Sequence, residues 1–330
     1  MLCLRPLRRQ ISRLGKGPLI RIGVDLMGGD NSPEILLKAL KEFVFPKGIQ
    51  IVFVGLPEYK QGSSHYIEAP EFIGMEEPPL SAIRKKKGAS ICVGLRALRD
   101  GKIDAFVSTG NTGALVSAAK LTLGMLPGVL RPVLLAQMPT KKGPVAILDV
   151  GASVQIKAAN LVQFALIGTS FWNDLGRDKP IVGLLNIGTE PLKGTSELRI
   201  AYHELQNYPS PPFRFAGNVE GRSVFDGNVD ILITDGFTGN VFLKTAEGIA
   251  NLILDRLEET LPKCELERIQ PQIADLSKHL HYSEQPGAIV AGVKKLVVKC
   301  HGYSTPKALI RGILGAFDHI HRNRVQKSRT

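Results

Sequence analysis

A run of small polar residues and glycines, Ser108-Thr109-Gly110-Asn111-Thr112-Gly113, has the composition of an anion-binding loop. The apolar residues before it, 103–107, predict a buried strand, and the residues after it predict a helix. A turn between a strand and a helix directs backbone N–H groups and the positive end of the helix dipole to one point, which suits an anion. The glycines could also serve only to let the chain turn tightly, and a single loop of this kind does not separate the two interpretations.

Four more polar loops that contain glycine directly follow apolar stretches. They lie at residues 25–30, 149–153, 186–194 and 235–240. Apolar strands that alternate with helices predict a mostly parallel sheet, and such sheets bind ligands at the carboxyl ends of their strands. All five loops would then open on the same edge of the sheet. This arrangement favours a functional site over simple turn chemistry.

The elements that must position these loops follow from the apolar patterns of the chain. Strands are predicted at residues 20–25, 49–55, 103–107, 143–150, 181–186, 213–216, 229–234 and 294–300. Helices are predicted at residues 33–43, 89–98, 114–119, 160–171, 248–261 and 305–320, with a further charged helical stretch that runs to about residue 281. We therefore expect an α/β protein with a mostly parallel sheet and helices on both faces, a three-layer α/β/α arrangement. A single catalytic domain would cover residues 20–320, with a helical hairpin at 246–283 as a dimer or membrane contact.

Most of the net charge of +12 lies in two segments without acidic residues, 1–19 and 321–330. We expect a disordered basic extension at the first segment and a basic tail at the second. The four cysteines have no C-x-x-C spacing, so neither a zinc site nor a disulfide framework is indicated, and a reducing cytoplasm fits. The most apolar long window, 121–138, is interrupted by Pro127, Arg131 and Pro132, which argues against a transmembrane span.

Five motifs of the chain together resemble the successive motifs of PlsX-type phosphate acyltransferases, in the same order. They are Asp25-Leu26-Met27-Gly28-Gly29-Asp30, Ser108-Thr109-Gly110-Asn111-Thr112-Gly113-Ala114-Leu115, Leu184-Leu185-Asn186-Ile187-Gly188, Gly217-Asn218-Val219-Glu220-Gly221-Arg222 and Asp235-Gly236-Phe237-Thr238-Gly239-Asn240-Val241. The similarity covers roughly residues 20–320, so it is more specific than any single glycine motif.

The resemblance implies an acyltransferase that makes acyl phosphate from acyl-[acyl carrier protein] and inorganic phosphate, at the start of bacterial phospholipid synthesis. It implies a fold similar to the phosphotransacetylases and to the isocitrate/isopropylmalate dehydrogenases. The implied partners are acyl carrier protein, inorganic phosphate and a downstream acyltransferase of the acylglycerol-phosphate pathway. We also expect a homodimer in the cytoplasm, with or without peripheral membrane contact, and we expect no cofactor, no metal and no nucleic acid.

Phosphate that attacks a thioester needs to be held near the carbonyl, and the developing oxyanion needs hydrogen-bond donors. The resemblance implies catalytic roles for Lys193, whose point charge suits phosphate, and for Asn240, whose amide could donate to the phosphate or the oxyanion. As a plain helix N-cap, Asn240 would look the same in the sequence. Further residues are expected to bind phosphate or acyl phosphate: Gly28, Gly29, Asn111, Thr112, Gly113, Asp235 and Gly239. Because carboxylates repel phosphate, we expect Asp25, Asp30 and Asp235 to orient loops or Lys193.

The chain departs from the family at two informative places. Ser153 stands where the family usually has Asn, and Cys264–Gln270 is polar where relatives that touch the membrane are apolar. Acyl carrier protein is acidic, so basic residues at 84–87 and Arg222 are expected to contact it.

Three alternatives remain open from the sequence. An NAD-dependent decarboxylating dehydrogenase would share the fold, although the chain has no G-x-G-x-x-G after its first strand. A phosphotransacetylase that acts on acyl-CoA is a closer alternative. A non-catalytic basic protein that binds lipid or nucleic acid is the third, and it rests on the basic terminal segments alone.

Overall fold

The computed structural model describes residues 19–60, 62–280, 287–300 and 305–327. The chain divides into two compact units, unit 1 with residues 1–124 and 293–330, and unit 2 with residues 125–292. A single catalytic domain over residues 20–320 stays a prediction. The alternation of strands and helices continues through both units without a change in composition. The basic N-terminal extension falls outside the described residues except for Leu19.

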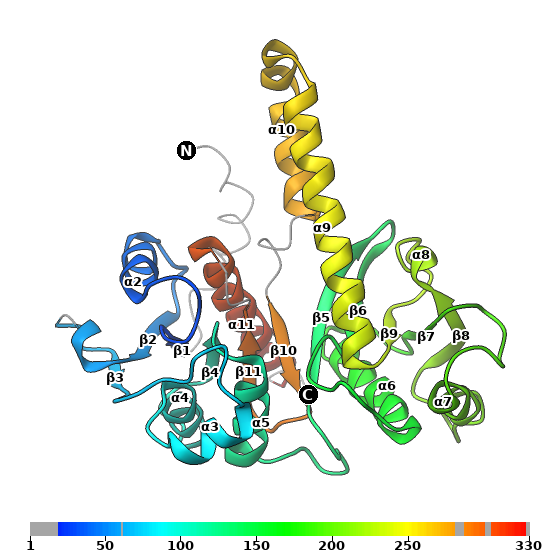
Figure 1. The fold of residues 1–330 in the computed structure, drawn as a ribbon, viewed down its shortest axis with the longest axis horizontal. Helices are drawn as coiled ribbons and strands as arrows, with labels where there is room; N and C mark the ends of the chain where they lie inside the picture. Colours follow the sequence, from blue (N-terminus) through cyan, green and yellow to red (C-terminus); the bar gives the residue numbers. More distant parts are fainter. Residues whose placement is uncertain (1–18, 61, 281–286, 301–304, 328–330) are drawn as a thin grey trace. The chain divides into compact units, whose positions relative to one another are not determined.

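In the part of unit 1 that the structure describes, parallel strands lie in the order β3-β2-β1-β4-β11. They are β1 (Ile20–Asp25), β2 (Ile49–Gly55), β3 (Tyr66–Glu68), β4 (Ala105–Ser108) and β11 (Leu296–Lys299). The helices of this unit are α2 (Pro33–Glu42), α3 (Pro79–Lys85), α4 (Ser90–Arg99), α5 (Thr112–Leu123) and α11 (Pro306–Lys327), and a short 3₁₀ turn covers Pro57–Tyr59. Strands β1 and β4 are almost wholly buried, which fits their continuous apolar sequences. Figure 1 shows these strands between α2 and α11 on one side and α3, α4 and α5 on the other.

The strands of unit 2 in the described residues lie in the order β10-β5-β6-β9-β7-β8. They are β5 (Val133–Thr140), β6 (Gly143–Leu148), β7 (Ile181–Asn186), β8 (Arg214–Glu220), β9 (Ile231–Ile233) and β10 (Ala288–Ala291). β5 pairs antiparallel with β6 and with β10, whereas the other pairs in this unit are parallel. Helices α6 (Ala158–Asn173), α7 (Ser196–Gln206), α8 (Gly221–Val224), α9 (Gly236–Thr260) and α10 (Lys263–Leu280) complete the unit. The core of unit 2 includes the fully buried Trp172 and Phe164 of α6.

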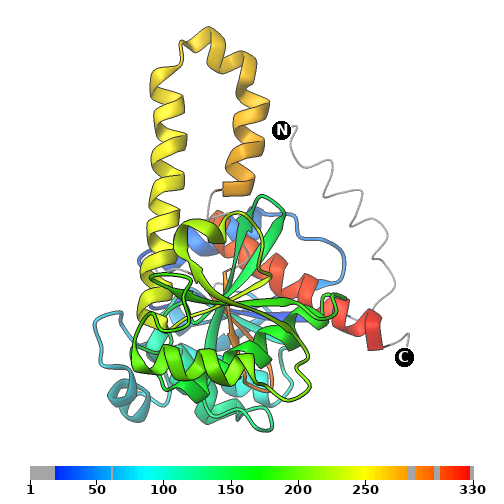
Figure 2. The same ribbon diagram turned by 90° about the vertical axis from the view of Figure 1, so that its right-hand side faces the viewer.

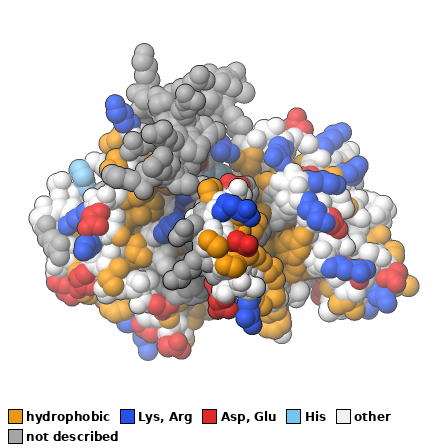
Figure 3. Space-filling view, turned by 90° about the horizontal axis from the view of Figure 1, so that it is seen from above, with side chains coloured by type: hydrophobic (Ala, Val, Ile, Leu, Met, Phe, Trp, Pro, Cys, Tyr) orange, Lys and Arg blue, Asp and Glu red, His pale blue; other side chains and the backbone are white. Residues whose placement is uncertain are grey.

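α9 and α10 form a hairpin that extends beyond the strands of unit 2 (Figures 1 and 2). α9 begins at Gly236, ten residues before the start of the predicted hairpin, and the predicted residues 281–283 lie outside the described part of the chain. The face seen from above carries hydrophobic, basic and acidic side chains next to one another (Figure 3). Within the described residues, none of the helices combines the length and the apolar character needed to span a bilayer.

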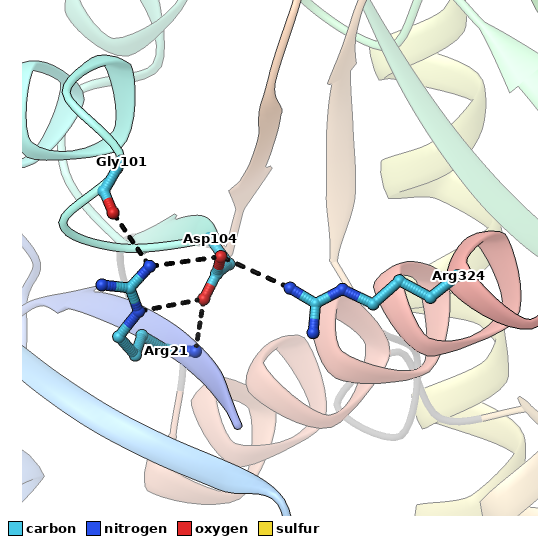
Figure 4. A network of polar contacts seen from close by, with 4 residues as sticks. All are labelled: Arg21, Gly101, Asp104 and Arg324. Carbon is cyan, nitrogen blue, oxygen red and sulfur yellow. Dashed lines mark hydrogen bonds and ion pairs between the residues drawn. The ribbon is translucent and has the colours of Figure 1, made fainter. Parts of the chain in front are cut away.

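The C-terminal segment differs from the predicted basic tail, because α11 continues through the expected end at residue 320 to Lys327. Arg324, in this extra length, donates to Asp104 Oδ1 at 3.5 Å, and Arg21 donates from its backbone N–H and its Nε to Asp104 Oδ2 at 2.8 and 3.2 Å (Figure 4). The guanidinium of Arg21 also donates to the carbonyl of Gly101 at 2.8 Å. Arg324, which was predicted to lie in a basic tail, thus pairs with Asp104 in the turn before β4.

Candidate functional site

The five polar loops fall into two groups, one in each unit. In unit 1, Asp25 at the end of β1 lies opposite Ser108 at the end of β4, so loops 25–30 and 108–113 leave neighbouring strands at the same level. In unit 2, Leu148, Ile233 and Leu184 lie level in the neighbouring strands β6, β9 and β7. Loops 149–153, 235–240 and 186–194 follow these three strands. The carboxyl-end placement predicted for the loops is therefore present within each unit.

The buried carboxylate of Asp25 organises the loops of unit 1. Its Oδ1 accepts from the Met27 N–H at 3.1 Å, and its Oδ2 accepts from the Ser108 hydroxyl at 2.7 Å. Ser108 Oγ in turn accepts from the Gly110 N–H at 3.1 Å. Burial is the main cause that raises the pKa of Asp25 from 3.8 to about 6, and hydrogen bonds and the charge of Lys299 oppose the shift. Asp25 thus orients the loops, as expected, and it does so from a fully buried position.

Lys299 is a buried cation that sequence reasoning missed. It ends β11, and its ammonium donates to the carbonyl of Thr109 at 3.1 Å and to the carbonyl of Cys300. A signal was present in the sequence, because Lys299 directly follows the apolar Leu296-Val297-Val298 in the strand predicted at 294–300. The hydroxyl of Thr109, on the same loop, is buried and has no hydrogen-bond partner within the described residues.

Asn111 has its side chain engaged by protein groups. As N-cap of α5 it accepts from the Ala114 N–H at 3.0 Å through Oδ1. Its Nδ2 donates to the carbonyls of Gly74, Met75 and Glu77 at 3.3, 2.9 and 3.2 Å. Asn111 therefore connects residues 74–77 to the start of α5. Its side-chain amide has this structural role in addition to any role in binding phosphate.

The glycines of unit 1 allow close approaches of backbone. Gly28 has a φ of +74°, and a Cβ there would lie 2.8 Å from the carbonyl of Ile73 and 3.4 Å from Gly110 Cα. A Cβ on Gly113 would lie 2.6 Å from a side-chain carbon of Pro79. Gly29 and Thr112, also predicted to contact the anion, are half-buried beside these positions, and Asp30 is exposed. Gly28 and Gly113 thus let these loops pack closely against residues 73–79, and the positive φ of Gly28 favours glycine.

In unit 2, the start of α9 packs directly on the loop after β6. Gly236 donates its N–H to the carbonyl of Ser153 at 2.8 Å, and a Cβ on Gly236 would lie 2.8 Å from Asp149 Oδ2. A Cβ on Gly239 would overlap the carbonyl oxygen of Asp149. Gly239 thus serves this packing, in addition to any role at the substrate.

Asp149 is fully buried at this junction. Its Oδ1 accepts from the N–H groups of Leu134, Gly151 and Ala152 at 3.2, 3.1 and 2.9 Å. Burial raises the pKa of the Asp149 carboxyl, and these backbone hydrogen bonds oppose the shift. Asp149 Oδ2 and Ser153 Oγ are both buried at this junction, and the Ser153 side chain also opposes the rise in the pKa of Asp149.

The N-cap of α9 is Asp235 and not Asn240. Asp235 Oδ1 accepts from the Thr238 N–H at 2.8 Å, and Oδ2 accepts from the Thr238 hydroxyl at 2.7 Å. Asn240 lies in the second turn of α9 and is exposed, and its Cγ would lie 3.7 Å from a Cβ on Gly151. The N-cap alternative for Asn240 is therefore wrong, because Asp235 caps the helix. The amide of Asn240 lies at the surface, above loop 149–153.

Lys193 lies on the loop after β7, with a side chain 49% exposed and its Nζ 3.9 Å from Glu190 Oε1. Its side chain folds over Gly188, where a Cβ would lie 3.2 Å from Lys193 Cγ. Asn186 anchors the loop, because its Nδ2 donates to the carbonyl of Lys193 and to Asn218 Oδ1, both at 3.1 Å. Asn218 Nδ2 donates to the carbonyl of Glu190 at 2.8 Å. A buried amide pair thus fixes the backbone of a loop whose lysine reaches solvent.

The basic residues predicted to contact a carrier protein are not equivalent. Arg84, Lys85 and Lys87 are exposed, whereas Lys86 pairs with Glu77 at 2.6 Å. Arg222 is exposed and pairs with Glu220 at 3.0 Å. Among the residues that the structure describes, no group of three His, Cys, Asp or Glu side chains gathers as a metal site would require.

The model of the fatty acid synthesis protein family matches residues 20–327 of this chain. The chain belongs to this family. It is 42% identical to a phosphate acyltransferase of Chlamydia pneumoniae over 319 residues, which is 91% of this chain and 95% of the relative. It is 40% identical to phosphate acyltransferases of Chlamydia caviae and Chlamydia trachomatis serovar D, over 91% and 92% of this chain and 95% of each relative. The resemblance to PlsX-type phosphate acyltransferases is thereby confirmed.

Solved structures show the same fold at low identity. The EutD phosphotransacetylase from Staphylococcus aureus superposes with a TM-score of 0.61 at 15% identity, covering 97% of this chain and 98% of that one. A phosphotransacetylase from Streptococcus pyogenes gives a TM-score of 0.61 at 16% identity, with 97% and 99% covered. A 4-hydroxythreonine-4-phosphate dehydrogenase from Klebsiella pneumoniae gives 0.56 at 12% identity, with 91% and 99% covered. The predicted α/β fold class is confirmed.

Proposed function

We propose that this family member transfers an acyl group from acyl-[acyl carrier protein] to inorganic phosphate and so produces acyl phosphate for phospholipid synthesis. The observation that carries the proposal is the 42% identity to a phosphate acyltransferase over 91% of the chain. The position of Lys193 and Asn240 on loops of the neighbouring strands β7 and β9 supports it.

The reaction needs little covalent participation from the protein. A phosphate oxygen forms a bond to the thioester carbon, a tetrahedral oxyanion develops, and the C–S bond then breaks with the electron pair leaving on sulfur. A thiol with a pKa of about 8.5 is a good leaving group, so a strong general acid is not required. Positioning and fixed donors can supply the catalysis.

In this mechanism Lys193 holds the phosphate, and Asn240 donates an amide hydrogen to the phosphate or to the oxyanion. A lysine on a flexible stem suits a tetrahedral anion that approaches from solvent. The rigid loop beneath it, fixed by Asn186 and Asn218, limits the positions that its ammonium can take. Asp149, Asp25 and Lys299 are positioning residues in this account, because each is buried and bonds to the loops.

The remaining partners are part of the same proposal. The acidic carrier protein would dock on exposed cations such as Arg84, Lys85 and Lys87, and a downstream acyltransferase would consume the acyl phosphate. A cytoplasmic homodimer, with peripheral membrane contact through the α9–α10 hairpin, completes the proposal.

The test is phosphate-dependent release of free carrier thiol from long-chain acyl-[acyl carrier protein]. The wild type should release thiol, while Lys193→Ala and Asn240→Ala should lose at least about a hundredfold in kcat/KM if each supplies a donor in the transition state. Circular dichroism controls for folding. Absence of release by the folded wild type would contradict the proposal.

A phosphotransacetylase that acts on acyl-CoA is the second candidate, because the fold matches the Staphylococcus aureus enzyme with a TM-score of 0.61. Release of coenzyme A thiol from acetyl-CoA, with no release from the acyl carrier substrate, would favour it.

A further inference from the structure

Five exposed hydrophobic side chains of unit 2 lie on or directly after loops 149–153, 186–194 and 235–240, the last two of which carry Lys193 and Asn240. Their exposed fractions are high for apolar residues: Val154 74%, Ile187 80%, Leu192 77%, Phe237 63% and Val241 51%. Single exposed apolar residues are ordinary, but a group of them at one edge marks a binding surface. We refer to these five residues as the acyl bed.

The strand order brings the acyl bed together within unit 2. β9 lies between β6 and β7, and neighbouring strands are spaced about 4.8 Å apart. Val154 follows β6, Phe237 follows β9 and Ile187 follows β7, each a few residues beyond positions that lie level in the sheet. The hydrogen bond from the Gly236 N–H to the Ser153 carbonyl joins the residues that directly precede Phe237 and Val154.

The acyl bed also flanks the two polar side chains of the proposed reaction. Leu192 directly precedes Lys193, and Val241 directly follows Asn240. Phe237 and Val241 are four residues apart on α9 and therefore lie on one face of the helix. Apolar and polar groups thus alternate within the same three loops, as a substrate with an ionic end and a hydrocarbon end requires.

We propose that the acyl bed binds the hydrocarbon of the acyl group next to the thioester and sets the preference for chain length. This rests on the proposed function. The hydrocarbon begins one bond from the carbonyl that phosphate attacks. A thioester held at Lys193 and Asn240 therefore has to pass its first methylenes over the side chains that adjoin them. A second protein seated on the acyl bed would cover those same two residues, which favours the acyl chain as occupant.

The test compares palmitoyl- and acetyl-[acyl carrier protein] as substrates for Phe237→Ala, Leu192→Ala and a control, because the acetyl group lacks the methylenes that would lie on the acyl bed. The control is Ile200→Ala, a change of a 47% exposed apolar residue on α7 that lies outside the acyl bed. Each methylene removed from water contributes about fourfold, so loss of contact with two methylenes that acetyl lacks should lower the palmitoyl-to-acetyl ratio of kcat/KM about fifteenfold in Phe237→Ala. The ratio should stay at the wild-type value in Ile200→Ala.

The outcomes separate this inference from the function beneath it. Absence of phosphate-dependent release from either substrate with wild-type protein overturns the proposed function and the acyl bed together. Release by the wild type with an unchanged ratio in both acyl bed variants overturns the acyl bed alone. An unchanged ratio with a shifted sedimentation coefficient would assign these residues to an interface between copies. Leu192 lies on an exposed loop, so Leu192→Ala keeps the test decisive if Phe237→Ala fails to fold.

Discussion

Gly239 is the residue at which the packing of α9 on the loop after β6 depends most directly on the absence of a side chain. A Cβ at this position would overlap the carbonyl oxygen of Asp149, which is backbone and cannot move aside alone. We expect Gly239→Ala to lower the free energy of unfolding by about 1–3 kcal/mol and to reduce activity, because Asp149 and Asn240 both shift.

The same helix offers the control for this prediction. A Cβ on Gly248 meets nothing within 4 Å, so Gly248→Ala should raise the stability of α9 by up to about 1 kcal/mol. Urea unfolding of both variants measures the two effects. Equal stabilities would contradict the packing described for Gly239.

Asp25 gives a prediction about pH. Its pKa is raised by burial from 3.8 to about 6 in the folded protein, so the folded state holds the proton more tightly than the unfolded chain. The stability that this group contributes is present below about pH 3.8 and is lost as the pH rises through about 6, by about 3 kcal/mol in total. Asp25→Asn cannot ionise and should lack this loss.

The measurement is urea unfolding of the wild type and Asp25→Asn between pH 4 and pH 7. The difference in unfolding free energy, wild type minus variant, should fall across this interval. A constant difference between pH 4 and pH 7 would contradict the prediction. It would show that the Asp25 carboxyl titrates with its usual pKa, because Lys299 and the hydrogen bonds offset the effect of burial.

At the scale of elements, Asn111 joins α5 to residues 74–77. Asn111→Ser keeps an oxygen that can cap α5 but removes the Nδ2 donor of three carbonyls, and Asn111→Ala removes both. Loss of the Nδ2 donor should lower the free energy of unfolding by about 1–3 kcal/mol in both variants. Loss of the cap should lower it by about 1 kcal/mol more in Asn111→Ala. Thermal unfolding measures both steps. An unfolding midpoint for Asn111→Ser equal to that of the wild type would show that the hydrogen bonds from Asn111 to residues 74–77 contribute nothing to stability.

Element patterns explain how much of the fold was predictable. The predicted strands 20–25, 49–55 and 181–186 match β1, β2 and β7 residue for residue, because each is rich in Ile, Val, Leu and Phe and is followed by a polar loop or turn. β5 was missed, because most of it lies within residues 121–138, a window considered only as a possible membrane span. α7 was missed as well, because its mixed charged and apolar sequence followed the loop of Lys193 without a break.

The site was less predictable than the fold. Lys193, Asn240 and the glycine loops could be named from motifs, but their partners depend on contacts between distant residues. Lys299 meets Thr109 across 190 positions of sequence, and Asn111 reaches residues 74–77 through its amide. No local pattern encodes such pairs, which is why the hydrogen-bond partners of Lys299 and of Asn111 emerge only from the fold.

At the scale of the whole molecule, docking of an acidic carrier protein depends on exposed charge. Arg84, Lys85 and Lys87 are free of the ion pair that occupies Lys86, so changing these three to Ser while keeping Lys86 preserves the Glu77 contact. We expect a higher KM for the acyl carrier substrate and a weaker dependence of KM on salt, because long-range attraction to exposed charges is screened. Lys38→Ser, on α2, serves as control. An unchanged KM in the triple variant would remove this segment from the docking surface.

Unit 1 is built from two stretches of sequence, residues 1–124 and 293–330, with all of unit 2 between them. On the ribosome, the strands β1 and β4 emerge long before β11, the neighbour that pairs with β4. A nascent chain therefore has every strand of unit 2 available while the carboxylate of Asp25 still lacks Lys299. The first polar loop cluster can therefore be completed only after the whole of unit 2 has been synthesised.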